Sequence, residues 1–380
     1  MSTTTMSTHA INELMNKTGF GFLRLPFDEN KGPDEAELQE VNDLVDAFME
    51  KGGTFFDTCY TYMEGHSEEC IRKCVVERKP RDSFRLVEKL PGYECHCYED
   101  CEKYFREEIE RCGTDKFDVY MLHWLNGENY RIAQQVDQFR FLRWVKEQGY
   151  AERIGFSFHD RASLLDEILT AHPEVDVVLI QLNYLDWESE GIESRKCYQT
   201  CLRHGKQVFV MEPVKGGTLA NLPQQASQLL RQVHPDWSDA DWALKFVQSL
   251  PGVEVCLSGM NDIAQIEANL KDVEPLNDEE LALLSRVCGI IGSNTAVPCT
   301  GCRYCVDHCP CGIPIPDYFK MYNEIRRDPE EGWKIRPAYA ELAGNGNRAG
   351  DCVSCHNCEE HCPQNIKIAA EMKNVADALE

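Results

Sequence analysis

The sequence predicts an α/β protein, built as a (β/α)8 barrel followed by a small, mainly helical domain. Short β-rich apolar runs alternate with amphipathic helical segments between residues 20 and 270, which is the pattern of a parallel sheet covered by helices. Eight such units over about 250 residues favour a closed barrel over an open doubly wound sheet. Beyond residue 290 the composition changes to cysteine, proline and glycine.

The strand candidates follow one another at regular intervals. In chain order they are residues 20–25, 54–58, 83–89, 117–123, 153–158, 175–183, 207–213 and 254–259. Helical periodicity is clearest between them at 35–51, 98–112, 137–148 and 239–249. Strands and helix-forming segments therefore alternate, as a barrel requires.

A change of composition marks the domain boundary. A helical segment at residues 278–286 is followed by the small, polar stretch GSNTAVP, which ends in a proline. Such a stretch is typical of a connection between domains. We expect the barrel at residues 1–290 and the second domain at residues 291–380.

Charge and hydropathy exclude several classes of function. The 380 residues include 64 acidic and 39 basic side chains, a net charge of −25, which would repel nucleic-acid phosphates and anionic lipid headgroups alike. No apolar run approaches the ~20 residues that cross a bilayer, and residues 1–17 lack a signal-peptide core. We therefore expect a cytoplasmic protein with no nucleic-acid or membrane partner.

Eight of the 20 cysteines form two runs with identical spacing, C-x2-C-x2-C-x3-C-P. This is the bacterial ferredoxin run, in which the fourth cysteine binds the other cluster. The sequence thus predicts two [4Fe-4S] clusters, one held by Cys299, Cys302, Cys305 and Cys362, the other by Cys352, Cys355, Cys358 and Cys309. Zinc is the competing interpretation, but proline-terminated runs of four cysteines fit it poorly. The 42-residue spacer, with a helix-like segment at 315–327, resembles helical two-cluster ferredoxin domains.

Twelve cysteines lie outside the two runs. Cys95, His96, Cys97 and Cys101 could chelate a metal, but no regular ligand spacing is complete. Reduced thiols in an anaerobic organism explain these cysteines better. Cys59, two residues after Asp57, is a candidate for the wall of a substrate pocket.

Three predicted strand ends carry residues suited to acid-base chemistry. FDTCYTYMEGHSEE provides Asp57 and Tyr62, VEKLP provides Lys89, and DVYMLHW provides His123. Barrel active sites lie at the carboxyl ends of the strands. A tyrosine with its ordinary pKa of about 10 donates protons readily near neutral pH only if a neighbouring cation lowers that pKa.

With these motifs, residues 19–270 resemble the aldo-keto reductase family, particularly members with a C-terminal ferredoxin-like domain. The resemblance implies Tyr62 as the general acid and Lys89 as the cation beside it. It further implies Asp57 as the counter-charge of Lys89 and His123 as the group that orients a small-molecule carbonyl substrate.

The resemblance also implies a nicotinamide site, matched by Ser157 and Gln181. Phe158 stands where the family has asparagine, so His159 is the candidate replacement, and Met211 stands where many members have an aromatic ring. The loops after strands seven and eight offer a cofactor-phosphate site with the candidates Lys215, Gly216, Gly217, Ser258, Gly259 and Asn269. No basic residue occurs between Val253 and Leu270, so NADH and NADPH both stay open.

Three hypotheses of function follow. In the first, the barrel reduces an aldehyde or ketone with NAD(P)H, while the clusters are structural or sense redox state. In the second, a ferredoxin-like redox partner sends single electrons through the clusters to a substrate or a flavin at the barrel mouth, because hydride transfer moves two electrons and a cluster moves one. In the third, the chain is a non-enzymatic electron-transfer or sensing partner, against which the four acid-base residues argue.

Overall fold

The computed structural model describes residues 17–271, 275–327 and 332–380. The chain forms two compact units. The first comprises residues up to Glu188 with 193–213 and 244–276, and the second comprises 189–192, 214–243 and 277–380. The second unit therefore takes an internal stretch, 214–243, in addition to the C-terminal part, whereas the sequence suggests one boundary near residue 290.

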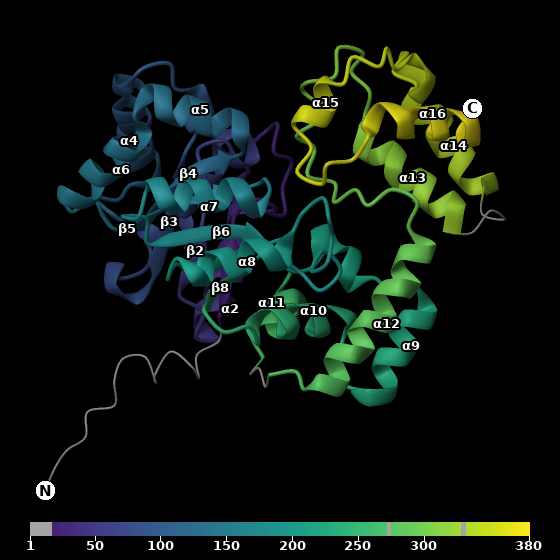
Figure 1. Ribbon diagram of the computed structural model, residues 1–380, viewed down its shortest axis with the longest axis horizontal. Helices are drawn as coiled ribbons and strands as arrows, with labels where there is room; N and C mark the ends of the chain where they lie inside the picture. The colour runs from purple at the N-terminus through teal and green to yellow at the C-terminus, as the bar shows by residue number, and fades with distance from the viewer. Residues whose placement is uncertain (1–16, 272–274, 328–331) are drawn as a thin grey trace, which may run out of the picture. The chain divides into compact units, whose positions relative to one another are not determined.

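Eight parallel strands close into a barrel in the first unit, as predicted (Figure 1). Each strand pairs with its neighbour in sequence, and β8 pairs with β1 through Gly19 and Leu257. The strands are β1 (Thr18–Gly21), β2 (Phe55–Asp57), β3 (Arg85–Leu90), β4 (Phe117–Leu125), β5 (Ala151–Phe158), β6 (Val177–Gln181), β7 (Gln207–Met211) and β8 (Val253–Ser258).

The first strand ends earlier than predicted. The sequence suggests a strand at 20–25, but the chain turns after Gly21, although Phe22 and Leu25 are buried. The apolar run therefore reflects burial in a loop and not an extended conformation. The main chain still approaches β2 there, because the Phe22 N–H donates to the Asp57 carbonyl at 2.9 Å.

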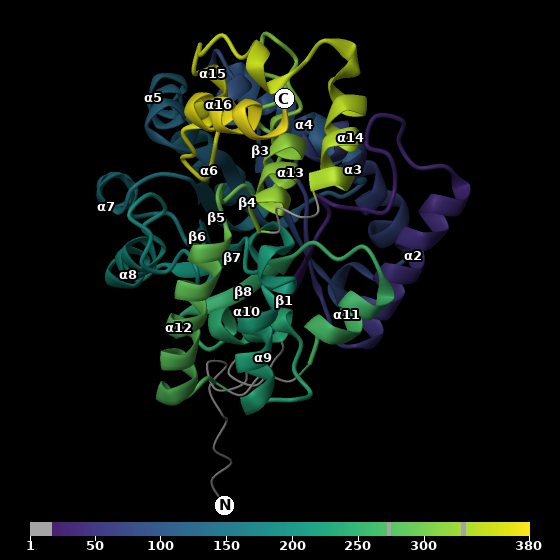
Figure 2. The same ribbon diagram turned by 90° about the vertical axis from the view of Figure 1, so that its right-hand side faces the viewer.

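Helices surround the strands of the barrel (Figure 2). They are α2 (Glu35–Glu50), α3 (His66–Cys70), α4 (Tyr98–Cys112), α5 (Gly127–Val136), α6 (Gln138–Glu147), α7 (Ala162–Ala171), α8 (Ser194–Arg203) and α11 (Ile263–Asn269), while α10 (Asp239–Gln248) runs from the second unit into the first. Capping residues define the ends of two of these helices. Asp34 and Glu37 form a capping box at the start of α2, and α4 ends at Gly113 in the left-handed conformation, as is common after a helix.

The barrel interior is filled by apolar side chains from alternate strand positions. They are Phe55, Val87, Val119, Met121, Val177, Leu179, Phe209, Val255 and Leu257. Since successive side chains of a strand point to opposite faces, Lys89 shares the inward face of Val87, and Glu88 points outward toward the helices. The order of residues in β3 thus places a lysine at the carboxyl end of the barrel core.

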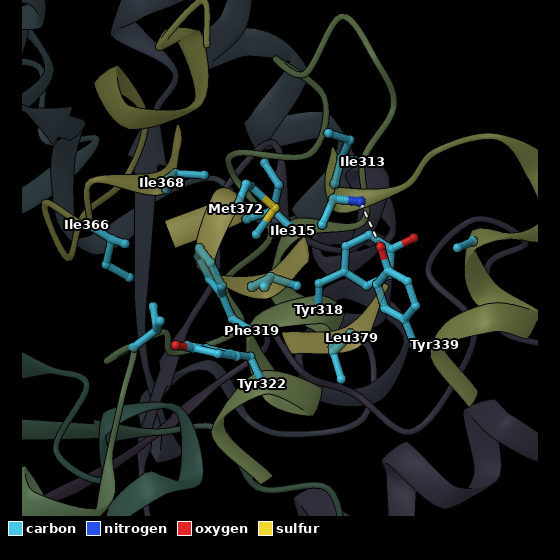
Figure 3. Close-up of a cluster of buried hydrophobic side chains, with 14 of the residues drawn as sticks. Ile313, Ile315, Tyr318, Phe319, Tyr322, Tyr339, Ile366, Ile368, Met372 and Leu379 are labelled. Atoms are coloured by element: carbon cyan, nitrogen blue, oxygen red, sulfur yellow. Dashed lines mark hydrogen bonds between the residues drawn. The ribbon is translucent and has the colours of Figure 1, made fainter. Parts of the chain in front are cut away.

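The second unit is helical around its own core (Figure 3). Its helices are α9 (Gln224–Val233), α12 (Asp278–Asn294), α13 (Ile315–Arg327), α14 (Gly332–Leu342), α15 (Asn357–Glu360) and α16 (Ile368–Leu379). The predicted helix at 315–327 is confirmed. Helix α12 is longer than the predicted 278–286 and takes in the first residues of GSNTAVP. Tyr318, Phe319 and Met372 are fully buried in the core between α13 and α16.

Short 3-10 or π turns complete the secondary structure. They span Tyr62–Gly65, Ile71–Val76, Arg81–Ser83, Gly92–Glu94, Lys215–Ala220, Ala343–Asn345 and Ala349–Asp351. Within the described ranges, no helix has the length and apolarity that crossing a membrane requires.

Candidate active site and cluster cavities

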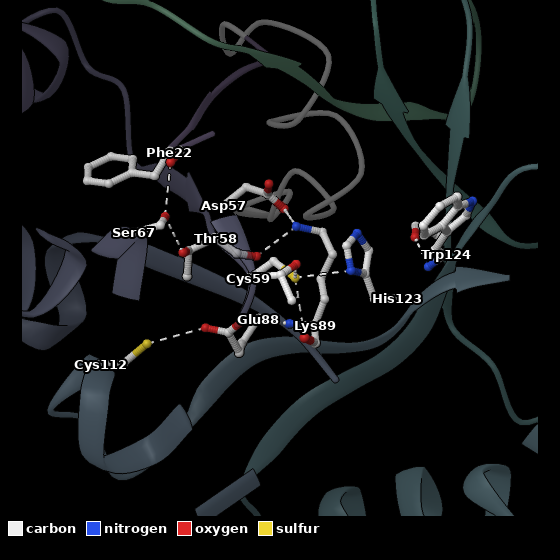
Figure 4. A network of polar contacts seen from close by, with 12 residues as sticks. Phe22, Asp57, Thr58, Cys59, Ser67, Glu88, Lys89, Cys112, His123 and Trp124 are labelled. Carbon is white, nitrogen blue, oxygen red and sulfur yellow. Dashed lines mark hydrogen bonds and ion pairs between the residues drawn. The ribbon is translucent and has the colours of Figure 1, made fainter. Parts of the chain in front are cut away.

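A buried ion pair lies at the carboxyl ends of β2 and β3 (Figure 4). The Lys89 Nζ is 2.7 Å from Asp57 Oδ1 and also donates to the Thr58 carbonyl at 2.7 Å. The Lys89 side chain is fully buried, and that of Asp57 is 4% exposed. Burial is the largest influence on the Asp57 carboxyl and raises its pKa, while Lys89 opposes this shift. Each charge thus depends on the other to remain buried.

Tyr62 stands over this ion pair, in the turn that follows β2. The Lys89 Nζ is 4.6 Å from the centroid of the Tyr62 ring. In the described part of the chain, no protein group hydrogen-bonds the Tyr62 hydroxyl. The sequence suggests a lowered pKa for this hydroxyl, but the pKa is instead raised well above its ordinary value, first by burial and then by the Asp57 carboxylate. The Lys89 ammonium binds Asp57 and Thr58 and leaves the phenol protonated.

His123, at the end of β4, faces Tyr62 and Cys59. The Tyr62 and His123 rings meet edge to face with centroids 5.8 Å apart, and Cys59 Sγ lies 3.1 Å from His123 Nδ1. Burial raises the pKa of the Cys59 thiol, and burial with the Lys89 charge lowers the pKa of His123 well below its ordinary value. The imidazole is therefore neutral and the thiol keeps its proton.

Aromatic rings extend the site beyond His123. Tyr93, in the loop after β3, lies 5.9 Å from the His123 ring and 5.8 Å from the Trp124 ring. Trp124 has a φ of 59°, which is strained for a bulky side chain. The Ser157 Oγ accepts from the Trp124 N–H at 2.7 Å, and the Trp124 carbonyl accepts from Asn129 at 2.7 Å. These two bonds hold the strained residue at the strand end.

The residues expected at the nicotinamide lie at neighbouring strand ends. Ser157 and His159 are at the end of β5, and Gln181 is the last residue of β6, where its amide donates to Asp186 at 3.2 Å. The buried His159 Nδ1 has no hydrogen-bond partner among the described residues. Burial, followed by the Lys89 charge, lowers the pKa of His159 to about 4. Phe158 is buried and Met211 packs against the barrel core.

The phosphate-loop candidates after β7 lie in the second unit. Lys215 is buried and donates to Gln364 at 2.7 Å, and a Cβ at Gly216 would lie 2.3 Å from the Thr300 carbonyl. Both glycines have positive φ, 61° at Gly216 and 93° at Gly217. This turn therefore packs against residues that flank Cys299 and Cys362.

The candidates after β8 remain together in the first unit. Asn269 donates to the Ser258 hydroxyl at 3.1 Å and accepts from Thr18 through its carbonyl at 2.9 Å. Gly259 lies against the Arg24 side chain, whose carbons are 3.5–3.7 Å from the position of a Cβ at Gly259. Arg24 thus brings a basic residue to a segment that has none of its own.

The eight cysteines of the two runs line two cavities in the second unit. One cavity is lined by Cys309, Cys352, Cys355 and Cys358 together with Cys311. The other is lined by Cys299, Cys302, Cys305 and Cys362. Among the described residues, these cysteines form no group of three sulfurs within 4.8 Å of one another, whereas a tetrahedral zinc site holds its sulfurs about 3.8 Å apart. The spacing fits a larger inorganic group.

The backbone at these cavities is shaped for sulfur ligands. Arg303, Gly301 and Gly312 have positive φ, and the N–H groups of Gly301 and Ile313 point at Cys299 and Cys309 sulfurs at 3.4 Å. The rings of His308 and His361, which precede the fourth cysteine of each run, stack with centroids 3.4 Å apart. Hydrogen bonds to the sulfurs are among the influences that set a cluster's potential.

Sequence reasoning missed Tyr93, Trp124 and Arg24. Trp124 lies one residue before the end of β4 and Tyr93 three residues after the end of β3, so aromatic residues near the strand ends were an available signal. Arg24 and Gly259 are far apart in the chain, and only the pairing of β1 with β8 brings them together. In the described ranges, Cys95, Cys97 and Cys101 form no three-ligand group close enough for one ion.

Both parts of the chain match known protein families. Residues 19–288 match the model of the aldo/keto reductase family, and residues 298–366 match that of a 4Fe-4S dicluster domain. An uncharacterized oxidoreductase of Bacillus subtilis, YqkF, is 23% identical over 302 residues, 71% of this chain and 92% of its own. An aldo-keto reductase of Mycolicibacterium smegmatis is 30% identical over 124 residues, which cover 33% of this chain and 42% of that protein.

Solved structures of aldo-keto reductases share the barrel fold of this chain. Aldo-keto reductase AKR11C1 from Bacillus halodurans, in its holo form, aligns with a TM-score of 0.57 and 21% identity, covering 71% of this chain and 91% of its own. An aldo/keto reductase from Klebsiella pneumoniae in complex with NADP and acetate aligns with a TM-score of 0.58 and 21% identity, covering 72% and 91%. At this identity the likeness concerns the barrel fold.

Proposed function

Because this chain belongs to the aldo/keto reductase family, we propose that it reduces an aldehyde or ketone with NAD(P)H at the strand ends of its barrel. The observation that carries the proposal is the buried Asp57–Lys89 pair under Tyr62, with His123 beside it. A nicotinamide, when bound, supplies a hydride to the carbonyl carbon. Asp57, Tyr62, Lys89 and His123 then act on the carbonyl oxygen.

In this proposal Tyr62 gives its hydroxyl proton to the carbonyl oxygen. Its raised pKa keeps the hydroxyl protonated at neutral pH, so it is ready to donate when the substrate oxygen becomes more basic than phenolate. Lys89, 4.6 Å from the ring centroid, stabilises the phenolate that remains. Asp57 holds Lys89 in place.

His123 orients the carbonyl through its other nitrogen. The Cys59 thiol keeps its proton and faces the neutral imidazole at Nδ1, so we assign the thiol as the donor. The histidine hydrogen then resides on Nε2, and this N–H is the group available to a carbonyl oxygen. Cys59 is thus a positioning residue.

The nucleotide would be bound by groups from β5, β6 and β8. The His159 Nδ1, which has no hydrogen-bond partner among the described residues, is a candidate to bind the nicotinamide carboxamide. Ser157 on β5 and Gln181 at the end of the neighbouring strand β6 are the other candidates. Ser258, Gly259 and Asn269 would serve the cofactor phosphates, where a glycine allows close backbone approach. Arg24 beside Gly259 supplies a cation for either nucleotide. Lys215, Gly216 and Gly217 are the weaker candidates, because Lys215 binds Gln364 and Gly216 packs on Thr300.

We assign two [4Fe-4S] clusters to the second unit, with ligands exchanged between the runs. One set is Cys299, Cys302, Cys305 and Cys362, and the other is Cys352, Cys355, Cys358 and Cys309. The two cavities are lined by these sets, and all eight donors are thiolates, the ligands such clusters take.

The test is an anaerobic assay of the full-length protein with NADH or NADPH and a panel of aldehydes and ketones. Tyr62→Phe should lower kcat about 10²–10⁴-fold with iron content unchanged. Tyr60→Phe is the matched control, because Tyr60 lies in the same turn but bonds Glu107 and Arg111. Equal activity of Tyr62→Phe and Tyr60→Phe would contradict the proposal.

A second candidate function is single-electron reduction through the clusters, from a ferredoxin-like partner to a substrate or flavin at the barrel. The hydrogen bonds of Ser157 and Gln181 favour this alternative. Ser157 binds Trp124 and Gln181 binds Asp186, so both polar groups expected at the nicotinamide are already occupied by protein groups. This alternative predicts that Cys305→Ala abolishes turnover and that nicotinamide alone does not support it. The first function predicts that Cys305→Ala retains nicotinamide-dependent turnover.

A further inference from the structure

Three acidic side chains and a thiol meet on the outer side of β3, away from the acid-base residues. They are Glu68 of α3, Glu88 of β3, and Glu108 and Cys112 of α4, and all four are 0% exposed. Glu68, Glu88 and Cys112 each offer a ligand atom, and these three atoms lie within 4.8 Å of one another. Figure 4 shows Glu88 turned from Lys89 toward Cys112.

The hydrogen bonds around Glu88 are those of a carboxylate. Its Oε1 accepts from the Lys89 N–H at 2.8 Å, and its Oε2 accepts from the Cys112 thiol at 3.3 Å. The Lys89 ammonium pairs with Asp57 on the opposite side of the strand. A buried anion without a facing cation costs several kcal/mol, so the Glu88 position calls for positive charge.

Two further carboxylate oxygens near Glu88 also lack a partner in the described part of the chain. Glu68 Oε1 and Glu108 Oε1 are buried and have no hydrogen-bond partner among the described residues. Their second oxygens are occupied, Glu68 Oε2 by Arg111 at 3.0 Å and Glu108 Oε2 by the Tyr120 hydroxyl at 2.6 Å. Buried polar atoms are normally paired, and a cation held by Glu68, Glu88 and Cys112 would pair the Glu68 oxygen.

We propose that Glu68, Glu88 and Cys112 form a structural site for Zn²⁺. Zinc takes thiolate and carboxylate ligands at about 2.3 and 2.0–2.2 Å in a tetrahedron, which places ligand atoms about 3.3–3.8 Å apart. The 3.3 Å between Cys112 Sγ and Glu88 Oε2 already matches such an edge.

The charges of the three ligands balance those of the metal and of Arg111. Zn²⁺ and the Arg111 guanidinium carry three positive charges, and Glu68, Glu88 and the Cys112 thiolate carry three negative ones. Binding replaces the Cys112 thiol proton by the metal, and that proton leaves to solvent. The competing occupant is the proton: without a cation, burial raises the pKa of Glu68 to about 7 and those of Glu88 and Glu108 well above their ordinary values.

The zinc site would tie three elements together beneath the acid-base residues. Glu88 is on β3, next to Lys89, while Glu68 follows Tyr62 into α3 and Cys112 is the last residue of α4. A metal bound there fixes the outward face of β3 to both helices. Because the role of this metal is structural, the zinc proposal holds whether or not the barrel reduces carbonyls.

The test begins with zinc analysis of the full-length protein with its clusters assembled, together with X-ray absorption at the zinc edge. We expect about one zinc per chain, with one sulfur and otherwise oxygen ligands. Four sulfur neighbours would mean zinc in the cysteine runs and would overturn the proposal. So would zinc below about a tenth per chain after equilibration with Zn²⁺.

Variants add a second measurement on the same site. Cys112→Ala and Glu88→Gln should each lower bound zinc at least tenfold while iron content is unchanged. Cys70→Ala is the matched control, since Cys70 is also fully buried, lies on α3, and offers no ligand atom to the group; it should keep its zinc. Zinc retained in Cys112→Ala contradicts the assignment. If a variant does not fold, the wild-type absorption spectrum still decides.

Discussion

The two units differ in how they compensate buried charges and buried sulfur atoms. In the barrel, Lys89 and Asp57 compensate each other within 2.7 Å, so this part of the site is formed by protein groups alone. In the second unit, eight cysteines line two cavities, and among the described residues no three of their sulfurs lie within 4.8 Å of one another. We infer that the barrel site is preorganised, whereas the second unit depends on what its cavities hold.

The largest effect should come from removing one cluster ligand. Cys309→Ala should lower the iron content by about half and abolish cooperative melting of the second unit. Iron and sulfide assays with calorimetry measure this. Cys311→Ala is the control, because Cys311 lines the same cavity but lies outside the predicted ligand set. Loss of iron in Cys311→Ala with retention in Cys309→Ala would reverse the assignment.

Next in size is the loss of the buried cation. Lys89→Met should destabilise the barrel by about 3–5 kcal/mol, because Asp57 is left buried and uncompensated. Asp57→Asn in the same chain should restore part of this. Lys79→Met, which breaks a partly exposed pair with Asp46, should cost less than about 1 kcal/mol. Urea unfolding compares the variants, and equal losses would refute the contrast between buried and surface pairs.

A moderate effect is expected from pH. The pKa of His159 is lowered from 6.5 to about 4. Between these two pH values the unfolded chain therefore binds a proton at His159 that the folded barrel does not bind. Stability should therefore fall as pH drops below 6.5, by up to about 2 kcal/mol between pH 6.5 and 5. Hydrogen exchange of the strand amides measures it. His159→Asn should flatten this slope; an unchanged slope would assign it to other groups.

The smallest effect concerns the thiol beside His123. Cys59→Ala should lower kcat about fivefold, the value of one hydrogen bond of ~1 kcal/mol, with KM little changed. Cys59→Ser should retain most of the activity, because a hydroxyl also donates to Nδ1. Nitrogen NMR of His123 reports the tautomer directly. A mixed tautomer in the wild type would remove the basis for this role.

Much of the molecule follows from local sequence patterns. Alternating strands and helices predict the barrel, and strand-end residues predict where Asp57, Tyr62, Lys89 and His123 meet. The cysteine spacing predicts two ligand sets. These signals are local or are repeated along the chain, so one sequence is sufficient to detect them.

Other features depend on contacts that no local pattern records. Arg24 reaches Gly259 only after β1 closes the barrel on β8, and Lys215 binds Gln364 across 149 positions. The pKa of Tyr62 is raised by burial and then by the Asp57 carboxylate, and both influences depend on the folded structure. Glu88 is one residue of an apolar strand in the sequence, and its companions Glu68 and Cys112 lie on two other elements.

The chain path of the second unit affects biosynthesis. Residues 214–243 belong to that unit but leave the ribosome before β8 exists, whereas the cysteine runs are made last. Ser227 and Asp239 can bond within this stretch at once, but His234 must wait for Glu280. A chain cut near residue 290 is therefore not a free-standing barrel: it keeps a segment whose partners at 300 and 364 were never made, exposed to chaperones and proteases.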